Sequence, residues 1–165
     1  MTESLQKLID VLRDELQQYG ELLALLEQQQ ELVATRAADG VLRTVAAINE
    51  QYTIIQTVRQ EREQRRRTLA QELGLDEDVE FFKLVHRLPA EVRPLISALV
   101  EENNRLLRRV QQRARQNHLL LQYSVQLMQN LLNTFAFLHQ SSTYTESGRV
   151  AAAGVTRYSR YDAVG

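Results

Sequence analysis

The sequence predicts an all-α protein: an elongated antiparallel helical bundle, or coiled-coil-like hairpin, with a short third helix and a long C-terminal helix. Glycine and proline number only six and two among 165 residues. Leucine, glutamine, glutamate and arginine, which favour helices, are abundant. Apolar residues recur at alternating steps of four and three, and no segment has the period of two that a strand requires.

The first predicted helix covers residues 3–36, with Thr2 as its N-cap. Its apolar positions form a coiled-coil seam, in which every third or fourth residue faces a neighbouring helix. The seam consists of Leu5, Ile9, Leu12, Leu16, Tyr19, Leu23, Leu26, Gln30 and Val33. Because only Gln30 is polar, this pattern predicts close packing against another helix.

A second helix is predicted over residues 39–73, with Asp39 as its N-cap. Gly74 follows where a left-handed C-terminal cap is expected. The short connection to the first helix makes the two antiparallel. The predicted seam is Val41, Val45, Ile48, Tyr52, Ile55, Arg59, Arg62, Arg66, Leu69 and Leu73.

A short third helix is predicted over residues 77–88, capped by Asp76, and a fourth over residues 90–139. Pro89 and Pro94 suit the beginning of the fourth helix, where the missing N–H costs least. Its seam contains polar positions, among them Asn103, Arg113 and Asn117. We expect these to face the seam arginines of the second helix if the two are antiparallel, with Glu61, Glu63, Glu101 and Glu102 as counter-ions. Residues 141–165 have no periodicity and predict a disordered tail, so residues 1–140 are predicted to form a single helical domain.

The stretch from Gln116 to Thr145 contains no charged residue, although 25% of the chain is charged. About seven charges would be expected at that composition. Its helical part is apolar over much more than the stripe that one packing contact buries. It is therefore either interior, packed among the other helices, or a surface that binds another chain. The predicted length of the fourth helix favours the second interpretation for part of it.

The sequence contains no pattern typical of an enzyme, a metal site or a cofactor site. There is no cysteine, and His86, His118 and His139 have no ligand spacing. The arginine clusters lack interleaved aromatic residues, so we expect no nucleic-acid partner. No apolar run is long enough to span a bilayer, so we expect no membrane insertion. The absence of cysteine suits a reducing, cytoplasmic location.

Several motifs together resemble the FlgN-type flagellar export chaperones. The second helix ends in Leu-Ala-Gln-Glu-Leu-Gly, at residues 69–74. The fourth contains Glu-Glu-Asn-Asn-Arg-Leu-Leu, at residues 101–107, and Asn-His-Leu-Leu-Leu-Gln-Tyr-Ser, at residues 117–124. The resemblance covers residues 5–140. It implies a cytoplasmic chaperone without ATP that escorts hook-associated proteins, the proteins of the hook–filament junction, to the flagellar secretion apparatus.

The resemblance also implies where the partners bind. The terminal helix of the client would lie on the fourth helix, against Leu119, Leu120, Tyr123, Leu127, Met128, Leu131, Leu132, Phe135 and Leu138. A tail tyrosine would dock at the export gate, and the candidates are Tyr144, Tyr158 and Tyr161. The alternative is a structural coiled-coil protein that forms a homodimer through the uncharged helix.

Overall fold

This computed structural model describes the backbone of residues 2–140 and the side chains of residues 3–136. Residues 2–140 form four helices, α1 (Thr2–Ala34), α2 (Ala38–Glu72), α3 (Phe81–Arg87) and α4 (Arg93–Gln140). No strand occurs among residues 2–140, so the predicted all-α fold is confirmed. The chain divides into two compact units, Met1–Leu121 and Gln122–Gly165, and the division falls within α4.

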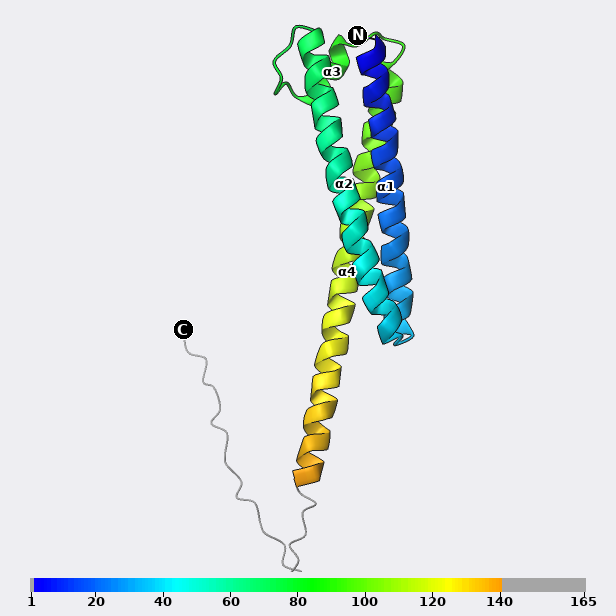
Figure 1. Cartoon of the computed structure of the whole chain (residues 1–165), viewed down its shortest axis with the longest axis vertical. Coiled ribbons are helices and arrows are strands. Elements are labelled where there is room, and N and C mark those ends of the chain that lie inside the picture. Colours follow the sequence, from blue (N-terminus) through cyan, green and yellow to red (C-terminus); the bar gives the residue numbers. More distant parts are fainter. Residues whose placement is uncertain (1, 141–165) are drawn as a thin grey trace, which may run out of the picture. The chain divides into compact units, whose positions relative to one another are not determined.

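In the first unit, α1 and α2 form the predicted antiparallel hairpin (Figure 1). Three contacts show the direction: Ser4 bonds Glu72, Glu15 bonds Arg62, and Gln18 bonds Gln51. The partner's residue number falls as the α1 number rises, which only antiparallel helices allow.

The hairpin connection differs from the prediction. Helix α1 ends at Ala34, and Arg36 has a left-handed φ of 58°. The backbone N–H groups of Arg36 and Ala37 donate to the carbonyls of Val33 and Leu32, which is a Schellman motif. Because this motif already closes the turn, α2 begins at Ala38 without a side-chain cap, and the prediction of Asp39 as N-cap is wrong.

The predicted seam of α2 is correct at Ile48 and Ile55, which pack in the interface, but alternate positions are displaced by one residue. Val45, Tyr52 and Arg59 are exposed, and the residues one position earlier, Thr44, Gln51 and Val58, are buried in their place. The Gln51 side-chain amide donates to the backbone carbonyl of Gln18 at 3.1 Å and to its side-chain oxygen at 2.8 Å. These bonds satisfy a buried polar side chain in the interface. An apolar flank of α2, including Leu42, Val45 and Tyr52, therefore faces solvent.

Within the first unit, α4 packs parallel to α1 with a constant register. The side-chain amide of Asn103 donates to the carbonyl of Leu12 at 2.9 Å, and that of Asn117 donates to the carbonyl of Leu26 at 2.7 Å. Donor and acceptor residues differ by 91 in both pairs. Both asparagines are buried, so the polar seam positions anchor α4 to the α1 backbone.

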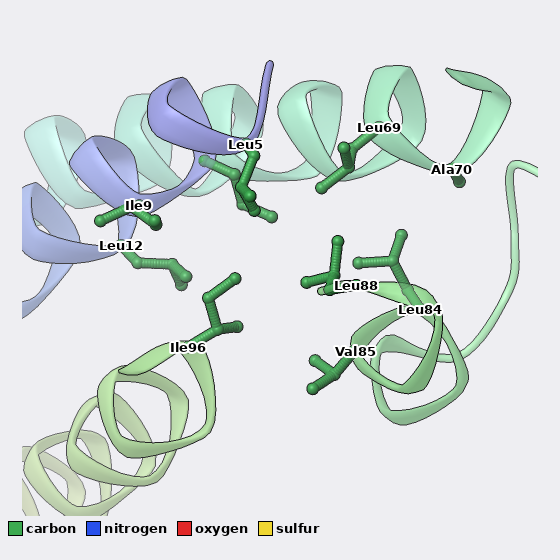
Figure 2. Packing of buried hydrophobic residues seen from close by; sticks show 10 residues of the cluster. Leu5, Ile9, Leu12, Leu69, Ala70, Leu84, Val85, Leu88 and Ile96 are labelled. Carbon is green, nitrogen blue, oxygen red and sulfur yellow. The ribbon is translucent and has the colours of Figure 1, made fainter. Parts of the chain in front are cut away.

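One apolar cluster holds α3 against the other helices of the first unit (Figure 2). Side chains from α1, α2, α3 and the beginning of α4 meet in it: Leu5, Leu8, Ile9, Leu12, Leu69, Ala70, Leu84, Val85, Leu88 and Ile96. A second cluster lies further along the hairpin and comprises Tyr19, Leu22, Leu23, Leu26, Ile55 and Val110. The seam predicted for α1 supplies residues to both clusters.

Between α2 and α3, the predicted C-terminal cap of α2 is confirmed and the predicted N-cap of α3 is wrong. Gly74 has a φ of +67°, and the N–H groups of Gly74 and Leu75 donate to the carbonyls of Gln71 and Ala70, so the left-handed cap is confirmed. Asp76 accepts a hydrogen bond from the Asp78 backbone N–H in a turn, instead of capping a helix. Helix α3 begins later than predicted, at Phe81, and α4 begins at Arg93, with Pro94 in its first turn.

The predicted meeting of the α2 arginines with the polar positions of α4 is correct in part. Arg62, Arg66 and Asn103 line one cavity of about 390 Å³. The counter-ion of Arg62 is Glu15 on α1, which the prediction missed, at 2.8 Å. Arg66 pairs with Glu63 at 2.5 Å, as expected. Because Glu15 is buried where α1 packs against α2, the cation nearest to it is on α2.

Candidate functional site

The uncharged part of α4 is the candidate site. Within the first unit, Leu119 and Leu120 are 52% and 38% exposed. Within the second unit, every side chain from Gln122 to Ala136 is exposed.

The exposed segment has two different faces. At 100° per residue, the large apolar side chains cover about half of the helix circumference. They include Tyr123, Leu127, Met128, Leu131, Leu132 and Phe135, with exposed fractions from 47% to 68%. Glutamine and asparagine occupy the other half, at Gln122, Gln126, Gln129 and Asn133. The segment is thus an amphipathic helix whose polar side chains are all uncharged.

The chemistry of this face suits protein recognition. Contiguous exposed apolar patches on a protein surface mark sites of interaction. Leucine and methionine side chains adapt to different partner shapes. Glutamine and asparagine can hydrogen-bond a partner without the desolvation penalty of a charge. Nothing in this arrangement resembles a catalytic constellation, and among the described residues no group of three or more His, Cys, Asp or Glu could hold a metal ion.

The predicted site residues fall into two groups. Eight of the nine predicted client-binding residues have described side chains, and all eight are exposed on α4. The side chain of Leu138, the ninth, lies outside the described residues, as do Tyr144, Tyr158 and Tyr161. Sequence reasoning missed the apolar flank of α2 at Leu42, Val45 and Tyr52, because it assigned two of these residues to the seam.

The sequence was compared with models of protein families. The family model described as FlgN protein matches residues 1–152. The chain belongs to the FlgN family. Membership assigns it the general role of a flagellar export chaperone, and FlgN is not known as a family of enzymes. No curated protein and no solved structure matches the chain. No helix within the described part of the chain is long and apolar enough to cross a membrane.

Proposed function

We propose that this FlgN-family chain is a cytoplasmic chaperone for hook-associated proteins and that α4 is its client-binding element. The amphipathic terminal helix of the client lies against the apolar half of α4, at the residues from Leu119 to Leu138 predicted above. The observation that carries the proposal is that every side chain of the uncharged amphipathic helix at residues 122–136 is exposed. Covering the client's own apolar stripe prevents its premature association before export.

The exposed anchors account for binding without nucleotide hydrolysis. A helix-in-groove contact draws most of its free energy from a few large apolar side chains. Leu127, Met128, Leu131, Leu132 and Phe135 are the largest exposed side chains towards the end of the described segment. Their flexibility allows two related clients to use the same face.

Charge substitution on the apolar face tests the proposal. Leu131→Glu with Phe135→Glu is expected to abolish binding of the hook-associated protein from the same organism, measured by isothermal titration calorimetry. Because both positions are exposed, the melting temperature should change little. The matched control is Leu42→Glu with Tyr52→Glu, which places equal charge on the exposed flank of α2. Unchanged binding by the first variant, or equal loss in both, contradicts the proposal.

The tail is proposed to deliver the loaded chaperone to the export gate through Tyr144, Tyr158 or Tyr161. Tyrosine and arginine, which are enriched at interaction hot spots, recur at residues 157–161. Deletion of residues 141–165 should preserve client affinity in vitro and reduce client secretion in cells. Normal secretion contradicts the delivery role, and lost client binding places the tail in the client site.

The alternative function is that of a structural coiled-coil protein that forms homodimers through α4. Sedimentation equilibrium separates the two. A stable dimer that Leu131→Glu with Phe135→Glu dissociates, together with no client binding by the wild-type chain, supports the alternative.

A further inference from the structure

The arginine-rich part of α4 before the apolar face has an unbalanced charge. No aspartate or glutamate occurs from Asn103 to the end of α4 at Gln140. Five arginines lie in this stretch: Arg105, Arg108, Arg109, Arg113 and Arg115. The protein as a whole has a formal charge of only −1, so the positive charge is local.

Only two of these arginines have a carboxylate partner among the described residues. Arg105 lies 2.6 Å from Glu102, and Arg113 lies 3.6 Å from Glu27. Arg108, Arg109 and Arg115 are exposed and form no ion pair with any residue whose side chain the structure describes.

The arginines of α2 are different, because neighbouring acids neutralise most of them. Four have a glutamate within 3.2 Å: Arg62, Arg65, Arg66 and Arg67. Most arginines of α2 are therefore paired with an acid. By contrast, Arg108, Arg109 and Arg115 of α4 are open to solvent.

Two of the open arginines share one face of α4 within the first unit. Arg108 and Arg115 lie about 10.5 Å apart along the helix, given a rise of about 1.5 Å per residue. Together with Gln111, Gln112, Gln116 and Leu119 they line a shallow depression of about 310 Å³. Guanidinium groups bind carboxylates through two parallel hydrogen bonds, and the glutamines add neutral donors and acceptors between them.

We propose that this arginine face binds a carboxylate-bearing helix of a partner protein, with acids spaced to meet Arg108 and Arg115. The proposal does not depend on client capture by the apolar half of α4. A protein fits better than nucleic acid, because no Phe, Trp or Tyr lies between Phe82 and Tyr123 to stack on bases. A protein also fits better than a lipid surface, because the opposite side of this stretch, at Val110 and Asn117, is buried and cannot insert.

Two designed peptides test the proposal on the full chain. Both are amphipathic peptides of about 21 residues, longer than the roughly 12–15 residues below which an isolated helix is marginal. One carries Glu at two polar positions seven residues apart, and the other carries Gln there. By fluorescence anisotropy, the Glu peptide should bind about tenfold more tightly at about 50 mM salt, and the difference should shrink at about 500 mM salt.

Charge reversal locates the binding face. Arg108→Glu with Arg115→Glu should remove the preference for the Glu peptide. The control, Arg43→Glu with Arg87→Glu, changes the net charge equally at two other exposed arginines without ion pairs among the described residues, and should retain it. Equal binding of the two peptides, no binding of either, or loss of the preference in the control overturns the proposal. The proposal is also overturned if the Arg108→Glu with Arg115→Glu variant keeps its preference for the Glu peptide but loses binding to duplex DNA or to phosphatidylserine vesicles.

Discussion

Arg62 of α2 binds the buried carboxylate of Glu15 on α1, with one guanidinium nitrogen 2.8 and 2.9 Å from its two oxygens. The Glu15 side chain is 1% exposed and that of Arg62 is 31% exposed. The hydroxyl of Tyr19 donates to the same carboxylate at 3.1 Å. A carboxylate removed from water requires such partners, so this network holds one register of the hairpin.

Removing the arginine alone should destabilise the protein. Arg62→Ala leaves Glu15 buried without its cation, and we expect a loss of about 2–4 kcal/mol in the free energy of unfolding. Urea denaturation measures the loss. The double variant Glu15→Leu with Arg62→Leu should recover most of it, because a buried ion pair can be replaced by apolar side chains of similar size. A single variant as stable as the wild type would show that Glu15 is solvated.

Tyr19 should make the stability fall at high pH. Burial, followed by the charge of Glu15, raises the pKa of Tyr19 from its ordinary value of 10.0 to about 12. The unfolded chain therefore loses this proton first, and the stabilisation present below pH 10 is lost as the pH rises towards about 12. Tyr19→Phe should flatten the fall in unfolding free energy over this range, measured by urea denaturation. Tyr52→Phe, at an exposed tyrosine, should keep the wild-type slope.

The two left-handed helix ends should respond oppositely to substitution. Arg36 has a left-handed φ of 58°, so Arg36→Gly should stabilise the protein by about 0.5–1 kcal/mol. Gly74→Ala should destabilise it by about 1 kcal/mol. A Cβ at Gly74 would meet nothing within 4 Å, so the loss comes from the left-handed backbone and not from a steric clash. Chemical denaturation of both variants checks the signs, and a stabilising Gly74→Ala would contradict the left-handed conformation.

A chain that ends after Leu121 should fold. The residues of both apolar clusters lie before this point, as do Asn117 and its bonds to Leu26 and Gln29. We expect a cooperative thermal transition close to that of the full chain, followed by circular dichroism, together with loss of client binding. A molten or unfolded product would show that residues beyond Leu121 contribute to the core.

Helix content and the α1 seam could be predicted because they depend on local sequence. Seam residues such as Leu5, Ile9 and Leu12 are apolar at coiled-coil spacing, and they are buried. On α2, Ile48 and Ile55 follow the same rule, but the alternate seam positions could not be predicted in this way. By type, Val45 and Tyr52 are better candidates for burial than Thr44 and Gln51. The hydrogen bond between Gln51 and Gln18, which favours burial of Gln51, exists only after the two helices have packed together.

The capping errors have a similar cause. Asp39 and Asp76 are both good N-cap residues by type. However, the backbone bonds at Arg36 and the turn at Asp76 determine where α2 and α3 begin. For the candidate site, the absence of charge from Gln116 onwards could be read directly from the sequence. Its exposure could not, because exposure is a property of the folded chain and not of its composition.

The constant offset between α1 and α4 restricts how the lengths of these helices can change during evolution. Asn103 and Asn117 are two heptads apart, and so are the carbonyls of Leu12 and Leu26 that they bind. A single inserted residue between the asparagines would rotate one of them by about 100° away from its acceptor. Only a gain or loss of whole heptads, made in both helices at once, preserves the two bonds. Homologous chains should therefore differ here in steps of seven residues, and tolerate irregular insertions chiefly in the connections on either side of α3.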